Sequence, residues 1–222
     1  NPLTLKRGFN QFVWDLKYPE AEKADGLILW NGTPSGITAA PGKYTAHIQI
    51  GGDSTSVTFN LLADPNYKCT QAEYEAQVSF LLQVQDKFNE TMKAIKKIKS
   101  TREQLTGYTT RLGKTCPAAL KNLGDSLSKR LTAIEELLHQ TKAKSGQDVL
   151  NYPIRLDDKL SGVFDMANSG NMAPPKQALD VFSGLATQVD AALAQLQVVL
   201  GEGLQAFNKM IVELRLPVIV AE

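Results

Sequence analysis

The chain has 222 residues, of which 24 are Lys or Arg and 23 are Asp or Glu, so its formal net charge is +1. A nearly neutral protein has no global field that favours nucleic acid or an anionic membrane. The hydrophobic content of 43% is ordinary for a globular protein, and no apolar run reaches the roughly 18 residues of a membrane helix. We therefore predict no nucleic-acid partner and no membrane span, in a chain long enough for two modest domains.

The first 65 residues have the pattern of short β-strands. Four runs are rich in β-branched or aromatic residues: 11–14, 27–30, 44–50 and 56–61. Asn31-Gly32, Pro41-Gly42 and Gly51-Gly52 supply turns around them. We expect residues 1–65 to form a small antiparallel β-sandwich. Because an Ig-like sandwich has about seven strands, we also expect further strands to precede Asn1 in a longer polypeptide.

Beyond Asp64-Pro65 the apolar period changes from two residues to about 3.6, which predicts a domain boundary followed by helices. Thr70 and Glu73 have the spacing of a capping box, which favours a helix start at this point. Three helices are predicted: from Thr70 to between Gly107 and Gly113, from Thr115 to about Lys144, and from about Leu156 to Ala167.

The longest apolar stripe begins after Pro174-Pro175. Its members are spaced alternately four and three residues apart: Ala178, Phe182, Leu185, Val189, Ala192, Leu196, Val199, Gly203, Phe207, Met210 and Leu214. This pattern predicts a helix roughly 60 Å long whose stripe faces other helices. At Gly203 either a neighbouring helix approaches closely, with Phe88 or Tyr74 of the first helix filling the gap, or the helix kinks. We favour the close approach.

These elements predict an α+β fold with two domains. Residues 1–65 form a truncated Ig-like β-sandwich, and residues 70–216 form an antiparallel bundle of three long helical layers, the middle one broken near 151–153. The similar lengths of the three layers allow each apolar stripe to be covered along its whole length. Residues 217–222 are expected to form an extended tail.

Three motifs follow one another in the first part of the chain: GFNQFVWDL at 8–16, PGKYTA at 41–46 and DP at 64–65. In this order they resemble the Ig-like module of flagellar hook-capping type in the C-terminal region of bacterial secreted proteins with a BNR-repeat, sortilin-like propeller of glycosyl-hydrolase type. The tail of the same family is similar to YPIRLDDKL at 152–160, PP at 174–175 and FN at 207–208.

The resemblance implies a bacterial protein that is secreted, periplasmic or on the cell surface, with the upstream propeller domain of the same polypeptide as its partner. The propeller lies outside this sequence, so no hydrolytic residue is carried over from it. We expect a non-catalytic accessory or interaction region. The alternative is a carbohydrate-binding module that presents substrate to an upstream catalytic propeller.

Trp14, Trp30 and Tyr44 are the candidate ligand-binding residues, because exposed aromatic rings form platforms for sugars. The competing interpretation is that these side chains pack in a core, which is favoured more strongly for Trp14 than for Trp30, since Trp30 adjoins a turn. Exposure of either tryptophan beside a polar groove would favour the carbohydrate alternative.

No catalytic constellation stands out in the sequence. His47 and His139 are the only histidines, and neither has metal-ligand spacing to other ligand residues, so we expect structural roles for both. Asp157 and Asp158 are adjacent and would point about 100° apart on a helix, so we expect them to stabilise a helix N-terminus rather than act as a catalytic pair. We expect no cofactor and no metal.

Cys69 and Cys116 flank the first long helix, which would separate them by tens of ångströms against a Cα limit of about 7 Å for a disulfide. We therefore expect free thiols, or thiols that pair only between molecules. The lysines of this helix at 93, 96, 97 and 99 have no interleaved aromatic residues, so we expect a solvated face rather than a nucleic-acid site.

Overall fold

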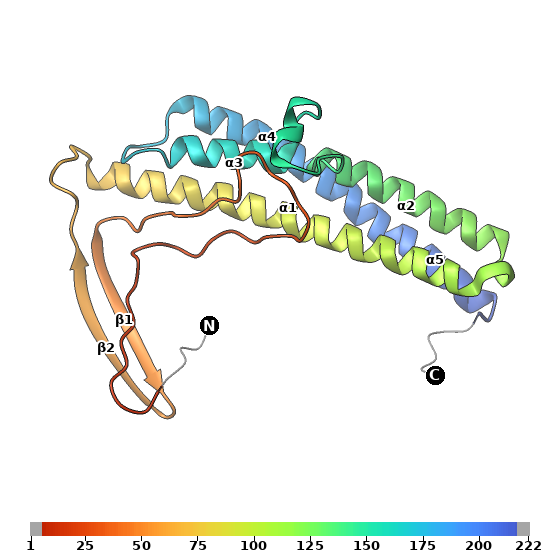
Figure 1. The fold of residues 1–222 in the computed structure, drawn as a ribbon, viewed down its shortest axis with the longest axis horizontal. Coiled ribbons are helices and arrows are strands. Elements are labelled where there is room, and N and C mark those ends of the chain that lie inside the picture. The colour runs from red at the N-terminus through yellow and green to blue at the C-terminus, as the bar shows by residue number, and fades with distance from the viewer. Residues whose placement is uncertain (1–5, 217–222) are drawn as a thin grey trace.

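A computed structural model describes residues 6–216 as an α+β protein that is mostly helical (Figure 1). Its elements in chain order are β1 (Gly42–Ile50), β2 (Asp53–Leu61), α1 (Gln71–Leu112), a 3₁₀ turn (Gly113–Thr115), α2 (Ala118–Leu138), a second 3₁₀ turn (Gly146–Leu150), α3 (Leu156–Ala167), α4 (Lys176–Val198), a π-helical turn (Val199–Gly203) and α5 (Leu204–Glu213). The predicted α+β class is confirmed. The extended tail predicted at 217–222 lies outside the described residues.

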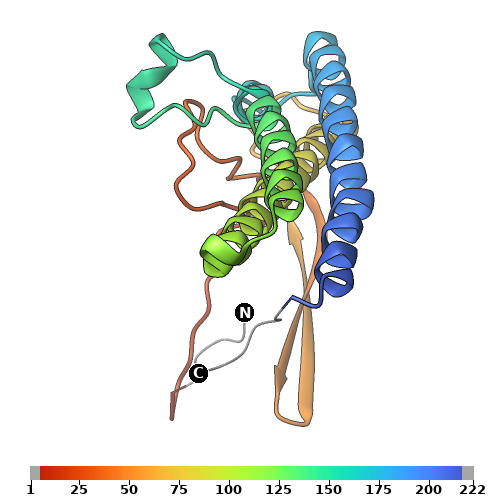
Figure 2. The same cartoon turned by 90° about the vertical axis from the view of Figure 1, so that its right-hand side faces the viewer.

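The helices form an elongated bundle. α1 spans it in one direction, α2 and α3 return along it, and α4 with α5 run along it again (Figures 1 and 2). α1 packs against α2, α3 and α4, while α4 also packs against α2 and α3. The core contains large side chains that are fully buried, among them Phe88, Ile95, Leu131, Leu160 and Phe164. The predicted helical bundle is thus present, and its middle layer is broken between α2 and α3.

The ends of α1 follow from local side-chain chemistry. Thr70 caps the helix, because its side chain accepts a hydrogen bond from the Glu73 amide while the Glu73 carboxylate accepts one from the Thr70 amide. The helix continues through Gly107 and ends at Gly113, whose φ of 54° lies in the left-handed region. The predicted start at Thr70 is confirmed. Of the two glycines predicted to end the helix, Gly107 lies inside it and Gly113 ends it.

α2 ends earlier than predicted. It stops at Leu138, and His139 has extended backbone, so the predicted continuation to about Lys144 is wrong. His139 and Gln140 are both buried, and both use their side chains to bind the chain beyond the helix: His139 reaches Asp157, and Gln140 donates to the carbonyl of Pro153. These tertiary bonds compete with another turn of helix, and apolar periodicity alone does not reveal them.

The close approach predicted at Gly203 is confirmed, and the backbone there also departs from the α-helix. A π-helical turn interrupts the α-helix at Val199–Gly203. A Cβ placed on Gly203 would lie 2.5 Å from Cδ2 of Leu127, so a neighbouring helix does approach closely there. The approaching side chain belongs to α2, so the prediction that Phe88 or Tyr74 of α1 fills this gap is wrong.

Only two of the four predicted strands exist. β1 and β2 pair antiparallel around Gly51-Gly52, with Ile50 opposite Asp53, as their sequence pattern predicts. Residues 11–14 and 27–30 are irregular, so those two strand predictions are wrong. Among residues 6–216 the paired strands form a single two-stranded sheet, and no sandwich is built from them.

Tertiary bonds explain why the run at 27–30 is not a strand. Its apolar side chains Leu27 and Leu29 pack against the helical core, while the Trp30 amide donates to the carboxylate of Asp158 in α3. The run at 11–14 precedes a tight turn in which Leu16 has a φ of 63° and the Asp15 carboxylate accepts from the Lys17 amide. Neither run has a neighbouring strand to pair with among the described residues.

Residues 17–39 lie along the helices rather than on the hairpin (Figure 1). Ala21 and Ile37 are buried within the same core as the helical side chains. Gln85 of α1 donates to the Pro19 carbonyl at 3.0 Å, and the Glu22 amide donates to Asn89 at 2.7 Å. This part of the N-terminal segment therefore shares the core of the bundle. None of the helices described at residues 6–216 combines the length and the apolar character needed to cross a bilayer.

Candidate functional site

Three aromatic rings gather at the end of the hairpin where β1 begins and β2 ends. Tyr44 and Phe59 face each other across the strands, with ring centroids 6.1 Å apart and planes 23° apart. Trp14 lies against both, at 5.4 Å from Tyr44 and 6.3 Å from Phe59. The structure therefore brings two of the three predicted ligand-binding residues together and adds Phe59. The two-residue loop at Gly51-Gly52 sets a register that pairs Tyr44 with Phe59, so the sequence did contain the information needed to find Phe59.

This aromatic cluster (Trp14, Tyr44 and Phe59) offers ring surface rather than free hydrogen-bonding groups. The Trp14 indole donates to the Lys17 carbonyl at 3.0 Å, and the Tyr44 hydroxyl donates to the Ala40 carbonyl at 2.7 Å. Burial raises the pKa of Tyr44 above its ordinary value. The rings remain partly exposed, with 37% of Phe59 accessible. The cluster is an apolar surface that only part of the chain covers.

Trp30 lies away from the aromatic cluster, on a loop that is hydrogen-bonded to α3. The Asp158 carboxylate accepts hydrogen bonds from the amides of Trp30 and Asn31, each at 2.9 Å. The Asn31 side chain donates back to the Asp158 carbonyl at 3.0 Å. The Trp30 side chain is 52% exposed but is not part of the aromatic cluster. The three predicted residues thus do not form one platform.

A buried His–Asp pair links the end of α2 to the start of α3. His139 Nδ1 lies 2.6 Å from Asp157 Oδ2, with His139 4% exposed and Asp157 fully buried. The other oxygen of Asp157 accepts from the Asp158 amide at 2.8 Å. Burial raises the pKa of Asp157, and the hydrogen bond with His139 acts in the opposite direction. The sequence prediction of a structural role for His139 named no partner, because His139 follows α2 and Asp157 lies in α3, 18 residues further along the chain.

A second charged pair joins α1 to α2 beside this histidine. Arg102 Nη1 donates to Glu135 Oε2 at 2.6 Å and to the Thr132 hydroxyl at 3.0 Å, and Glu135 is 2% exposed. An open pocket of about 530 Å³ lies next to this pair. It is lined by Gly26, Ile28, Lys99, Arg102, Thr132, Glu135, His139, Thr141, Ala143 and Lys144. We call this the cationic pocket, because three of these side chains are basic and one is acidic.

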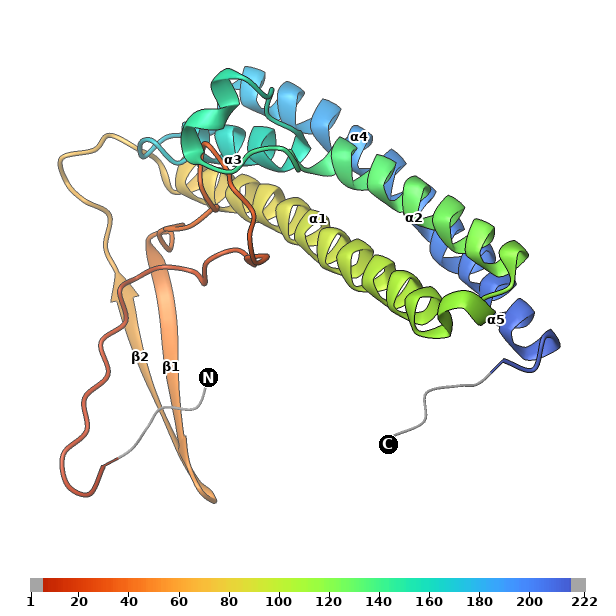
Figure 3. The same cartoon turned by 45° about the vertical axis from the view of Figure 1, so that its right-hand side comes forward.

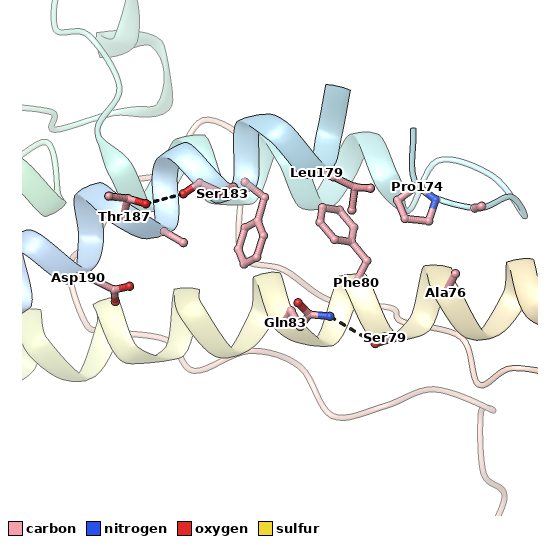
Figure 4. Close-up of a pocket in the computed structure, with 12 residues that line it drawn as sticks. Ala76, Ser79, Phe80, Gln83, Pro174, Leu179, Ser183, Thr187 and Asp190 are labelled. Atoms are coloured by element: carbon pink, nitrogen blue, oxygen red, sulfur yellow. Dashed lines mark hydrogen bonds between the residues drawn. The ribbon is translucent and has the colours of Figure 1, made fainter. Parts of the chain in front are cut away.

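A shallower groove of about 800 Å³ separates the first turns of α4 from α1 (Figure 4). Phe80 of α1 and Phe182 of α4 form its apolar floor, with an edge-to-face contact at 5.5 Å. Polar side chains such as Gln83 and Thr187 line it further along (Figure 4). Its chemistry is that of an ordinary helix–helix seam.

The lysines of α1 do more than form a solvated face. Lys93 and Lys96 both reach the carboxylate of Glu22, at 3.3 and 3.2 Å, and Lys99 donates to the Asp25 carbonyl at 3.3 Å. These contacts hold the N-terminal segment on α1, while the side chains of Lys93 and Lys96 stay 66% and 47% exposed, so this face is solvated as predicted and also binds the segment. Cys69 and Cys116 lie at opposite ends of the 42-residue α1, and each is a free thiol. Residues 6–216 contain no group of three His, Cys, Asp or Glu side chains placed to hold a metal ion.

The chain matches no protein-family model, no curated protein and no solved structure. The resemblance to the C-terminal region of BNR-repeat propeller proteins therefore rests on the sequence motifs alone. The function has to be argued from the geometry of the hairpin, the bundle and their pockets.

Proposed function

We propose that this chain is a non-catalytic interaction region of a larger secreted bacterial protein of the BNR-repeat, glycosyl-hydrolase-like type. In this proposal the β1–β2 hairpin packs on strands from the upstream part of the same polypeptide, which also carries the propeller, and together these strands complete an Ig-like sandwich. The observation that carries the proposal has two parts: the hairpin stands clear of the bundle (Figures 1 and 3), and apolar side chains on one of its faces are more exposed than buried.

The two faces of the hairpin differ sharply in character. Cross-strand partners share a face, so Tyr44, Ala46, Ile48 and Ile50 lie on the same side as Phe59 and Val57. The opposite face is polar and internally bonded: Thr45 contacts Thr58 at 3.2 Å, and Ser56 contacts His47 at 2.6 Å. This alternation is typical of a strand pair with one side in water and the other packed on a second layer.

The second layer is mostly missing from the described chain. Trp14 covers the end of the apolar face that carries Tyr44 and Phe59, but Ile48, Ile50 and Val57 are 53%, 56% and 59% exposed. A two-stranded hairpin is marginal in water unless further strands or a helix cover it. A strand-bearing neighbour is the occupant that this geometry favours, because it would both cover the face and pair with a free strand edge.

Hydrogen exchange tests this proposal. We expect the amides of residues 42–61 to exchange rapidly in this chain alone and to be strongly protected in the intact parent polypeptide. Val57→Lys should restore rapid exchange in the parent, because it places a charge on the apolar face. Thr58→Lys is the matched control, since it lies on the polar face of the same strand and should leave the protection in place. Equal exchange of the hairpin in the two proteins would contradict the proposal.

The carbohydrate-binding alternative is favoured by one specific observation, the partly exposed rings of the aromatic cluster. A glycan array probed with this chain distinguishes the two functions. Saturable sugar binding that Trp14→Ala abolishes, and that Trp30→Ala leaves intact, would support the alternative. The interaction function predicts no retained glycan.

Glycoside hydrolysis is not part of the proposal. It requires two carboxylic groups roughly 5–10 Å apart that can act on one bond. Of the carboxylates in and behind the cationic pocket, Glu135 is bound by Arg102, and Asp157 lies buried behind His139. We therefore expect a panel of chromogenic glycosides to remain uncleaved by this chain.

A further inference from the structure

We propose that the cationic pocket between α1, α2 and the two loops at 26–28 and 141–144 binds a small ligand through an oxyanion group, a carboxylate or a phosphate. This site is separate from the hairpin and does not depend on the proposed interaction function. Its volume of about 530 Å³ lies within the range of 300–1,000 Å³ that is typical of small-molecule sites.

The charges around the pocket do not balance. Glu135 is the acidic side chain of the lining, and Arg102 neutralises it at 2.6 Å. Lys99 and Lys144 have no carboxylate within ion-pair distance among residues 6–216, and the hydrogen bond of Lys99 goes to a backbone carbonyl. Two ammonium groups from different segments therefore border one cavity without an acidic partner. An anionic ligand would supply that partner.

The floor of the pocket is preorganised. Glu135 and Thr132 both accept from Nη1 of Arg102, which fixes the plane of the guanidinium and leaves its other N–H groups for a ligand. His139 is held from behind by Asp157 through Nδ1, so Nε2 is the ring atom available to the pocket that this residue lines. Buried partners that fix the orientation of polar groups are typical of binding sites and are not needed for a solvated patch.

The path of the chain also assembles this site. α2 stops at Leu138, so that four residues of the segment that follows line the pocket instead of extending the helix: His139, Thr141, Ala143 and Lys144. Lys99 donates to the Asp25 carbonyl, which holds the following loop beside the pocket that Gly26 and Ile28 line. The walls thus come from three segments of the chain that are distant in sequence: 26–28, 99–102 and 132–144.

Titration of isotope-labelled protein, followed by amide chemical shifts at constant ionic strength, tests the proposal. The probes are inorganic phosphate in one series and citrate in another. We expect saturable shifts at residues 26–28 and 139–144 with at least one probe. Saturation by phosphate alone would identify a phosphate site, and saturation by citrate alone a carboxylate site. Saturation by neither would overturn the proposal.

A pair of double variants separates a specific site from general charge attraction. Lys99→Gln with Lys144→Gln removes the two unpaired charges, and we expect affinity to fall about tenfold or more. Lys97→Gln with Lys142→Gln removes two charges from the same two segments, but neither residue lines the pocket, so affinity should change less than about twofold. Equal losses in both variants would contradict a built site. Arg102 is left unchanged, because its removal would strand the buried Glu135.

Discussion

The bundle and the hairpin follow the same rule of apolar patterning and reach opposite outcomes. Phe88 and Leu131 lie on apolar helix stripes and are fully buried, because the helices α1, α2, α3 and α4 pack against one another. Ile48 and Val57 lie on an equally regular apolar strand face, and more than half of each side chain is exposed. A pattern of apolar residues therefore predicts which face will be buried but does not say which segment buries it.

One part of the first 65 residues is buried against the bundle, and another part forms the exposed hairpin. Residues 17–39 are irregular, yet they bury Ile37 completely in the core of the bundle. Residues 42–61 have regular strands, yet β1 and β2 pack on each other and on no helix; the nearest link to the bundle is the bond from Gln71 to the carbonyl of the preceding Pro41 at 2.8 Å. Regular secondary structure and integration into the core are thus separate properties in this chain.

The largest expected loss of stability comes from a substitution in the bundle, and it is compared with an equivalent substitution in the hairpin. Phe88→Ala removes a fully buried ring from α1, so the free energy of unfolding measured by urea denaturation should fall by about 3–5 kcal/mol. Phe59→Ala in the hairpin removes a ring that is 37% exposed, and the helical transition should shift by less than about 1 kcal/mol. Similar shifts for the two variants would mean that the hairpin is a full part of the cooperative core.

The next prediction concerns the packing of the final rod on α2. Gly203→Leu forces a side chain into the space of Leu127, which is 1% exposed, and should destabilise the bundle by about 1–3 kcal/mol. Gly203→Ala should cost less, since helix propensity partly offsets the contact with a flexible methyl group. Gly184→Ala in α4 meets no atom within 4 Å and should be neutral or stabilising by up to about 1 kcal/mol. A higher urea midpoint for Gly203→Leu would contradict the close approach.

How well the sequence predicted each part depended on the range of the interactions that decide it. The Thr70–Glu73 capping box and the hairpin loop are set by neighbouring residues, and the sequence predicted both, as it did the bounds of α3. The early end of α2 depends on His139 meeting Asp157, and the irregular path at 27–30 depends on Asp158 holding the loop. Those contacts join residues that are far apart in the chain, and which residues meet in this way cannot be predicted from a single sequence.

The same distinction applies to the candidate sites. Trp14 and Tyr44 were predicted from residue type, and Phe59 follows once the hairpin register is known. The cationic pocket was not predicted, because its charged residues are spread over α1, α2 and the loop after α2. Lys99 was considered only as part of a surface run, since its relation to Lys144 exists only in the folded chain.

The smallest expected effect lies at the junction between the two regions. Thr70 follows the segment that leaves β2 and caps α1 through two reciprocal bonds with Glu73. Thr70→Ala removes the side-chain acceptor and should destabilise the bundle by about 1 kcal/mol, with faster amide exchange confined to the first turn of α1. Thr70→Ser keeps the acceptor and should behave like the native chain in both measurements. If faster exchange spread from the first turn into β1 and β2, the cap would be holding the hairpin as well as the helix, and the independence of the two regions would have to be abandoned.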